Sequence, residues 1–338
     1  MGLAVHAGLR YTAGGTAWDL MEVDRGVTED RMGKRRWVRL RVPASTANLG
    51  AGFDALGMAL GLYNEIELER IGSGMRLEIE GEGAERLQAL GAQNLVARAV
   101  TATLTHLGEP PDGLRVRMIN RIPLSRGLGS SSAAVLGGVA AAAALAGAAL
   151  TPEALLDLAL PLEGHPDNIA PALLGGLTVA TLVRGRVRCV KLPVPELLQV
   201  VAVIPDFRLP TVKARQALPP TVPRSDAIFN IGRVALFLAA MQTGRLDLLG
   251  EGVKDRLHQP YRAPLVPGMP EVLAEGERVG ALACFLSGAG PTLLALAAGD
   301  PGEIGARMVR CWHNQAGVSA RAAVLAIDRQ GTRLEEEQ

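Results

Sequence analysis

The stretch PLSRGLGSSSAA, at residues 123–134, is the most distinctive part of the sequence. It follows the alternating apolar run LRVRMINRI at 114–122, which predicts a strand. It precedes VLGGVAAAAALAGAAL at 135–150, whose alanine content and lack of proline predict a buried helix. The order of strand, glycine- and serine-rich loop, and helix is typical of a phosphate-binding loop.

This loop combines two properties that an anion site needs. Gly127 and Gly129 lack a Cβ, which lets another group approach the backbone closely. Three hydroxyl side chains, Ser130, Ser131 and Ser132, come at the start of the helix, where free N–H groups and the positive end of the helix dipole favour negative charge. The loop lacks the lysine of a Walker A loop and does not fit GxGxxG, so an ordinary loop capping a core helix is the structural alternative.

The composition limits the class of protein. The 338 residues are enough for two domains, and 48% apolar residues allow a sizeable core. A net charge of +1 gives no reason to expect nucleic acid or a membrane surface as a partner. The three cysteines, Cys189, Cys284 and Cys311, fit neither a disulfide framework nor a zinc pattern and suit a reducing cytoplasm. We see no membrane-spanning run and no signal peptide.

Strands interleaved with helices predict an α+β fold. The predicted strands are 37–42, 62–71, 75–80, 114–122, 177–183, 198–204, 282–286, 292–298 and 322–327, and the predicted helices are 94–107, 135–150, 153–162, 169–174, 225–241 and 303–317. Pro193 and Pro195 mark a domain boundary. We expect a disordered extension at 1–35, domains at 36–196 and 197–330, and a tail at 331–338.

The loop motif PxxxGLGSSSA resembles the phosphate loop of the GHMP kinases, a superfamily of small-molecule kinases. Five further blocks are similar to the homoserine kinases within it: PASTANLGAGFD at 43–54, EGHPDNIAPALLGG at 163–176, KARQALPP at 213–220, DRLHQPYRAPLVPG at 255–268 and LSGAGPT at 286–292. The resemblance covers nearly the whole chain beyond the first 35 residues. Five blocks in order are far more specific than any one of them.

The resemblance implies a two-domain fold, with a ribosomal protein S5 domain 2-like, ATP-binding N-terminal domain and a ferredoxin-like C-terminal domain. It implies a cytoplasmic homoserine kinase, which phosphorylates the hydroxyl of L-homoserine with ATP and Mg²⁺ on the way to threonine. The partners are then L-homoserine and ATP, without nucleic acid or membrane, and a homodimer is compatible with the sequence. The alternatives are another kinase of the superfamily, acting on mevalonate or a sugar, or a nucleotide-binding regulator without turnover.

Homoserine has an ammonium, a carboxylate and a hydroxyl, and the matched blocks carry groups for each. The residues assigned to the substrate by resemblance are Asn48, Asp54, His165, Asn168, Arg215 and Arg262. The aspartate would bind the ammonium and the arginines the carboxylate, since a planar guanidinium grips two oxygens. The asparagines would hold the hydroxyl end, and the histidine would orient the substrate. The structural alternatives are a turn aspartate, solvated arginines and a turn histidine with satisfied hydrogen bonds.

The resemblance also assigns nucleotide and metal binding. The nucleotide residues are Pro123, Leu124, Ser125, Arg126, Gly127, Leu128, Gly129, Ser130, Ser131, Ser132, Ala133 and Asn94. Mg²⁺ needs few protein ligands, because it keeps several waters. We expect Ser131 to supply a hydroxyl and Asp157 a carboxylate, directly or through water. An exposed helix acid is the structural alternative for Asp157.

The turn HPDN at 165–168 is where we expect the catalytic residues His165, Asp167 and Asn168. In mevalonate kinases an Asp in the equivalent turn, with a Lys elsewhere, activates the alcohol. In homoserine kinases an asparagine, which corresponds to Asn168 here, takes the place of that acid, and no general base is assigned. Positioning and charge neutralisation would then do most of the work, with γ-phosphate oxygens receiving the hydroxyl proton.

Overall fold

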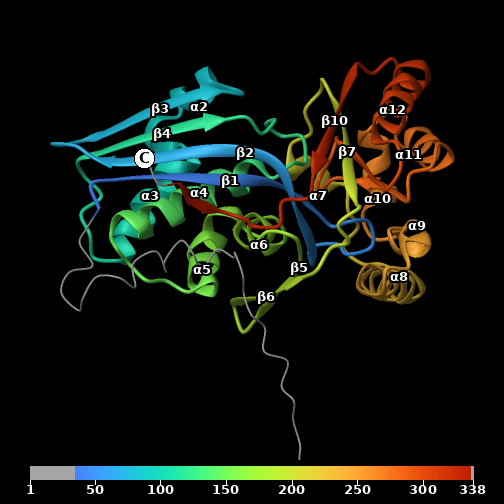
Figure 1. The fold of residues 1–338 in the computed structure, drawn as a ribbon, viewed down its shortest axis with the longest axis horizontal. Coiled ribbons are helices and arrows are strands. Elements are labelled where there is room, and N and C mark those ends of the chain that lie inside the picture. Colours follow the sequence, from blue (N-terminus) through green and yellow to red (C-terminus); the bar gives the residue numbers. More distant parts are fainter. Residues whose placement is uncertain (1–34, 336–338) are drawn as a thin grey trace, which may run out of the picture.

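The computed structural model describes residues 35–335, which form two β-sheets with helices packed against them (Figure 1). The larger sheet has seven strands, with the path β11-β1-β2-β4-β3 and with β5 and β6 attached through β2. Its strands are β1 (Trp37–Ala47), β2 (Leu56–Arg70), β3 (Met75–Gly81), β4 (Leu114–Asn120), β5 (Leu177–Val183), β6 (Arg186–Leu192) and β11 (Arg333–Glu335). The long β2 pairs with β5 near its start and with β4 near its end, so it joins both parts of the sheet.

One face of this sheet is covered by helices, which lie below it in Figure 1. They are α3 (Leu95–His106), α4 (Ser130–Leu145), α5 (Pro152–Glu163) and α6 (Pro166–Leu174), while the short α2 (Ala84–Ala89) and η1 (Gly91–Gln93) precede α3. Two glycines let α4 pack tightly between the sheet and α3. A Cβ on Gly137 would lie 2.1 Å from Cδ1 of Ile66 in β2, and one on Gly138 would lie 2.8 Å from the carbonyl oxygen of Val96 in α3.

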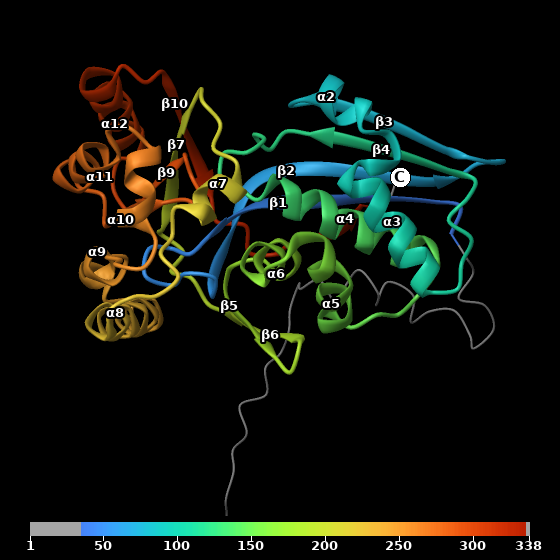
Figure 2. The ribbon, with the colours of Figure 1, turned by 180° about the vertical axis from the view of Figure 1, so that it is seen from behind.

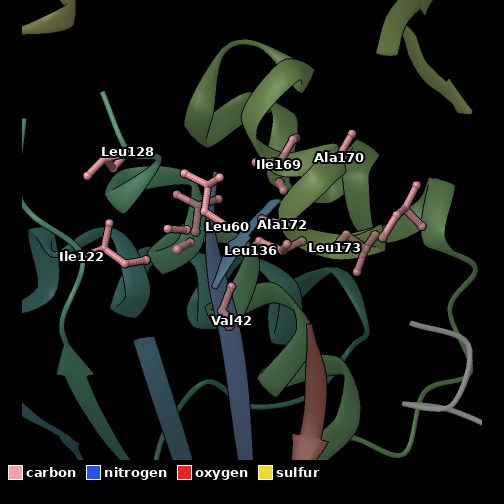
Figure 3. Close-up of a cluster of buried hydrophobic side chains, with 14 of the residues drawn as sticks. Val42, Leu60, Ile122, Leu128, Leu136, Ile169, Ala170, Ala172 and Leu173 are labelled. Carbon is pink, nitrogen blue, oxygen red and sulfur yellow. The ribbon is translucent and has the colours of Figure 1, made fainter. Parts of the chain in front are cut away.

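The main hydrophobic core lies between α4, α6 and the larger sheet (Figure 3). Leu136 of α4 is fully buried in the same cluster as Val42 of β1 and Leu60 of β2. Ile169 and Leu173 of α6, also fully buried, belong to this cluster. Because burial stabilises each such side chain by roughly 1.5–3 kcal/mol, this cluster holds α4 and α6, and the loops before them, in fixed positions.

The second sheet has four antiparallel strands in the order β10-β7-β9-β8. They are β7 (Gln199–Pro205), β8 (Ala283–Leu286), β9 (Leu293–Ala297) and β10 (Ala320–Ala326), with α11 (Met269–Arg278) and α12 (Pro301–Ala316) packed against them. Between β7 and α11 come α7 (Thr211–Gln216), α8 (Arg224–Thr243), η2 (Leu246–Leu248), α9 (Leu249–Gly252), α10 (Gln259–Arg262) and η3 (Ala263–Leu265). This order of strands and helices is ferredoxin-like, which confirms the predicted fold class.

The end of the chain differs from the prediction. We expected residues 331–338 to form a tail, whereas Arg333–Glu335 forms β11 and pairs with β1 of the first sheet. Asp328 accepts a hydrogen bond from the Tyr63 hydroxyl of β2 at 2.8 Å, which ties this return to the first sheet. The predicted extension at 1–35 lies, apart from its last residue, outside the described residues. Between residues 35 and 335, no helix is long and apolar enough to cross a membrane.

We predict that Leu136→Ala destabilises the protein by about 2–5 kcal/mol, because a fully buried side chain is lost from the core. The matched control is Leu182→Ala in β5, where the side chain is 49% exposed and the change should stay within about 0.5 kcal/mol. Urea unfolding of both variants measures the difference. Equal unfolding midpoints for the two variants would contradict the packing described for α4.

Candidate active site

A cavity of about 450 Å³ opens where the two sheets meet, and nearly all the predicted site residues line it. The loop between β4 and α4 forms one wall, and the turn between α5 and α6 forms another. The segment after β1, helices α7 and α10, and the turn between β8 and β9 complete the lining. These elements are far apart in the sequence, and Figure 2 shows three of the helices, α4, α6 and α7, near the middle of the molecule. A cavity of this size suits a small-molecule ligand.

The predicted phosphate loop approaches β1 very closely. Gly129, which caps the start of α4, has φ of 69°. A Cβ there would lie 2.1 Å from Oγ of Ser45, so a side chain at this position would displace the loop. The backbone N–H of Ser45 donates to the carbonyl of Leu128 at 3.2 Å. The loop is therefore held with the first turn of α4 facing the cavity, where its free N–H groups and positive dipole end attract anions.

The second glycine turn, between β8 and β9, holds the other side of the loop. Oγ of Ser287 donates to the carbonyl of Gly127 at 2.5 Å. A Cβ on Gly127 would lie 2.1 Å from the carbonyl oxygen of Ser287. Arg126 donates from Nε to Pro205 and from Nη2 to Asp206, both at 2.7 Å and both to backbone carbonyls at the end of β7. Both domains thus fix the loop.

Glu163, at the end of α5, is the carboxylate closest in contact with the loop. Its Oε1 accepts hydrogen bonds from Oγ of Ser131 at 3.0 Å and from Oγ of Ser132. Burial raises the pKa of the Glu163 carboxyl. No Lys, Arg or His nitrogen lies within 4 Å of it among residues 35–335. A half-buried carboxylate that forms no ion pair with a lysine or arginine among residues 35–335 is well placed to bind a cation.

Two predicted site residues do not line the cavity. Asp157 accepts a hydrogen bond from the backbone N–H of Val187 at 2.8 Å and forms an ion pair with Arg186 at 3.3 Å, so it anchors β6 to α5. Asp157 therefore faces away from the cavity, and Glu163 is the acid of α5 that contacts the loop. Ala133 is fully buried beneath the loop and contributes to the core rather than to the cavity wall.

The start of α6 brings three predicted residues to the cavity. Nδ1 of His165 lies 3.0 Å from Oδ1 of the buried Asp167. Burial alone would lower the pKa of His165, but the hydrogen bond and the charge of Asp167 outweigh it and raise that pKa. Oγ of Ser45 donates to Oδ1 of Asn168 at 3.0 Å. This bond fixes the amide of Asn168 and leaves its NH₂ group to face the cavity.

Arg262 of α10 is a buried cation without an acidic partner. Its side chain is 2% exposed, and among residues 35–335 no carboxylate lies within 4 Å. Its Nη1 donates to the carbonyl of Gly288 at 3.0 Å, and its Nε to that of Ala214 at 3.3 Å. Burial lowers the pKa of Arg262 to about 10. Because a buried unpaired charge is costly, this guanidinium favours an anionic ligand.

Arg215 of α7, by contrast, is paired with Asp54. The two nitrogens of its guanidinium lie 2.8 and 3.1 Å from the two carboxylate oxygens. Asp54 has φ of 55°. Oδ1 of Asn48 accepts from the backbone N–H of Asp54 at 3.0 Å, and Nδ2 of Asn48 donates to Gly288 at 2.9 Å. Asn48 therefore positions the aspartate instead of presenting both of its polar atoms to a ligand.

Sequence reasoning missed several residues of this site. The ring of Phe53 stacks on the imidazole of His258, with centroids 5.1 Å apart. The guanidinium carbons of Arg215 and Arg262 lie 5.9 and 5.3 Å from the centroid of the same ring. Apolar side chains at the other end of the cavity were also missed: Leu87, Leu90 and Met118. Glu163 could have been found, because it opens the block EGHPDN that was already recognised.

Asn94 occupies the apolar end in a structural role. Its side chain accepts from the backbone N–H of Val96 at 3.0 Å, which caps α3, and donates to the carbonyl of Leu87 at 3.0 Å. The cavity therefore has an apolar end, a phosphate-binding loop in its middle and a charged end with two arginines. This layout suits a ligand with a flat aromatic group, followed by phosphates, beside a small zwitterion.

Two family models match the chain. The model of the GHMP kinases N terminal domain matches residues 94–176, which include the phosphate loop and the turn before α6. The model of the GHMP kinases C terminal matches residues 237–318, which include α10 and the second glycine turn. The two models therefore cover the two sides of the cavity.

Individual relatives agree with these models. Homoserine kinase of Moorella thermoacetica is 48% identical over 269 residues, or 80% of this chain and 90% of that protein. For homoserine kinase of Thermus thermophilus the identity is 47% over 290 residues, or 86% and 96% of the two chains.

Solved structures agree as well. The structure of homoserine kinase from Cytophaga hutchinsonii matches with a TM-score of 0.82 and 28% identity, covering 91% of this chain and 100% of that one. The structure of L. major mevalonate kinase in complex with R-mevalonate matches with a TM-score of 0.63 and 18% identity, over 89% and 98% of the chains, which is a likeness of fold alone. The chain belongs to the homoserine kinase family of the GHMP kinases.

Proposed function

We propose that this protein is an ATP-dependent homoserine kinase, which transfers the γ-phosphate of ATP to the hydroxyl of L-homoserine and forms O-phospho-L-homoserine for threonine biosynthesis. Relatives named homoserine kinase cover most of the chain at 47–48% identity. The observation that carries the proposal is the charged end of the cavity, where Arg262, Arg215 and Asp54 gather beside a phosphate-binding loop. Two cations and one anion match the carboxylate and ammonium of an amino acid.

The nucleotide would lie along the loop. The free N–H groups of the first turn of α4 would bind phosphate oxygens, and the apolar side chains of Leu87, Leu90 and Leu95 would cover the adenine. The contacts of Gly127 and Gly129 with the two domains hold these donors in place before ATP binds. Such preorganised donors stabilise charge at the transferred phosphoryl group without a cost of reorganisation during the reaction.

The amino acid would bind at the charged end. Arg262 would hold its carboxylate, helped by Arg215, and Asp54 would hold its ammonium. The NH₂ group of Asn168 would donate to the hydroxyl oxygen, since its carbonyl oxygen is occupied by Ser45. These contacts would bring the hydroxyl to the γ-phosphate in line for attack, and we infer that such positioning replaces a dedicated protein base.

We further propose that the enzyme uses Mg²⁺. Among the described residues no cluster of three or more His, Cys, Asp or Glu side chains could hold a metal ion. Mg²⁺ commonly binds through one or two carboxylates together with substrate phosphates, and Glu163 with the Ser131 hydroxyl provides such a pair of hard oxygen donors. When bound, Mg²⁺ neutralises charge on the nucleotide phosphates. The raised pKa of Glu163 is consistent with a carboxylate that needs a cation beside it.

The cellular setting is also part of the proposal. The three cysteines of the described residues are free thiols, which fits a reducing cytoplasm. We propose a cytoplasmic enzyme whose partners are ATP and L-homoserine. A regulator without turnover is less well supported, since Glu163 supplies a carboxylate in contact with the phosphate-binding loop.

An ADP-release assay with ATP, Mg²⁺ and L-homoserine tests the proposed function. We expect turnover with L-homoserine and none with R-mevalonate or galactose. Arg262→Ala should raise the KM for homoserine roughly 10- to 100-fold, because it removes a charge-assisted contact to the carboxylate. Arg256→Ala is the matched control, since Arg256 belongs to the same block but is half-exposed and pairs with Asp226. Phosphorylation of mevalonate or galactose but not homoserine would refute the proposal.

Glu163→Gln should lower kcat at least about 100-fold, because the charge that holds the metal is lost while the acceptor for Ser131 and Ser132 remains. It should also raise the Mg²⁺ concentration needed for half-maximal activity. Asp157→Asn serves as the control, because Asp157 does not line the cavity. Its activity should stay within about threefold of the wild type, as for an ordinary surface substitution. A larger loss in Asp157→Asn than in Glu163→Gln would return the metal to Asp157.

Asp167→Asn should lower kcat less than about 100-fold, because general bases contribute roughly 10²–10⁴-fold and we expect none here. The variant should mainly raise the KM for homoserine, since His165 loses the carboxylate charge that raises its pKa. Steady-state kinetics, with binding of both substrates measured separately, decide the point. Loss of all turnover with both substrates still bound would identify Asp167 as the base.

A further inference from the structure

The two charged groups proposed to bind the ammonium and the carboxylate of the substrate are bound to each other. Both guanidinium nitrogens of Arg215 contact the carboxylate of Asp54, at 2.8 and 3.1 Å. Each of these side chains is 38% exposed, so the ion pair lies at the edge of the cavity rather than in open solvent. A ligand that takes over the contacts of either group must displace the other.

Arg262 differs from Arg215 in this respect. It has no carboxylate within 4 Å among residues 35–335, and its donors go to two backbone carbonyls and to Nδ1 of His258 at 3.2 Å. An anion can therefore bind Arg262 without breaking an ion pair. The charged end of the cavity thus contains one available cation and one cation that is already neutralised.

We propose that the Asp54–Arg215 ion pair is a charge filter that opens only for a zwitterion. The inference rests on the proposed function, and it concerns how the same site rejects other small alcohols. The ammonium of an amino acid would replace Arg215 at Asp54, and its carboxylate would replace Asp54 at Arg215. The number of ion pairs rises with a zwitterion, because one internal pair is exchanged for two with the ligand.

A ligand with one charge cannot make this exchange. A hydroxy acid can bind Arg262 alone, but if it also takes Arg215 it leaves Asp54 half-buried without a cation. An amino alcohol that takes Asp54 leaves Arg215 without an anion. Leaving one member of a partly buried pair uncompensated costs more than the pair itself contributes. The filter therefore penalises single charges beyond the loss of one contact.

The surroundings of the pair increase this penalty. The guanidinium carbons of Arg215 and Arg262 both lie within 6 Å of the centroid of the Phe53 ring, at 5.9 and 5.3 Å. The charge of Arg215 contributes, after burial, to the lowered pKa of Arg262. When an amino alcohol displaces Arg215 from Asp54, the two guanidiniums stay close together without an anion between them. A ligand carboxylate shared by both arginines removes that repulsion.

The test uses two analogues of homoserine. One is 4-hydroxybutanoate, which lacks the ammonium, and the other is 3-amino-1-propanol, which lacks the carboxylate. Asp54→Asn suits the test, because Asn tolerates the positive φ of 55° at this position and keeps the size of the side chain. We expect Asp54→Asn to weaken binding of L-homoserine and to strengthen binding of 4-hydroxybutanoate about 2- to 5-fold, as release of one partly exposed ion pair allows. A residue that only binds the ammonium would leave the affinity for 4-hydroxybutanoate unchanged.

The reciprocal variant is Arg215→Gln. It should weaken the binding of L-homoserine and strengthen the binding of 3-amino-1-propanol by a similar factor. Calorimetric titration of the full-length enzyme, saturated with a non-hydrolysable ATP analogue and Mg²⁺, measures these affinities. Asp226→Asn, which releases Arg256 from an ion pair outside the cavity, is the control and should change none of them. Equal affinity for the ATP analogue in all variants shows that they are folded.

The filter is supported if both variants gain affinity for their single-charge ligand. It is overturned if either gain in affinity is absent, because removal of either member of the ion pair should free the other member for a ligand. The wild-type assay with L-homoserine separates this result from the proposed function. Phosphorylation of homoserine without the two gains refutes the filter alone, whereas absence of homoserine phosphorylation refutes the function.

Discussion

The close contact of one glycine- and serine-rich loop with both domains is the constraint on which the rest of the structure depends. Gly129 leaves no room for a Cβ beside Ser45 of the first domain, and Gly127 leaves none beside Ser287 of the second. The loop therefore cannot move without both sheets. Because the cavity lies around this loop, the same contacts fix the distance between the nucleotide end and the charged end. Preorganisation of this kind is the main contribution that a protein makes to phosphoryl transfer.

Electrostatics divide the cavity into parts with different tasks. Glu163 is a half-buried carboxylate with a raised pKa beside the loop, and Arg262 is a buried guanidinium with a lowered pKa at the opposite end. Burial destabilises the charged form of both groups, and a ligand of the opposite charge stabilises it. The Asp54–Arg215 pair between the domains neutralises itself instead. The cavity is thus prepared for a cation at the phosphates and an anion at the arginines.

Motifs predicted the fold and most of the site, whereas single positions within a helix were less certain. The loop and the matched blocks placed Arg215, Arg262 and Asp54 in one cavity before any contact was known. The acid of α5 was misassigned because Asp157 and Glu163 are six residues apart, so they point about 120° apart around the helix and only one can face the loop. The return of β11 to the first sheet was missed, because Arg333–Glu335 is a three-residue strand with no periodicity of its own. Phe53 gave no signal, since its contacts depend on helices far along the chain.

A crystal structure of the enzyme with a non-hydrolysable ATP analogue and L-homoserine tests the central claim most directly. The account predicts phosphate oxygens at the backbone N–H groups that follow Gly129, with the homoserine carboxylate on Arg262 and its ammonium on Asp54. It also predicts that the loop itself barely moves on binding, because both domains already hold it. Phosphates bound away from the start of α4, or an amino acid bound away from the two arginines, would contradict it.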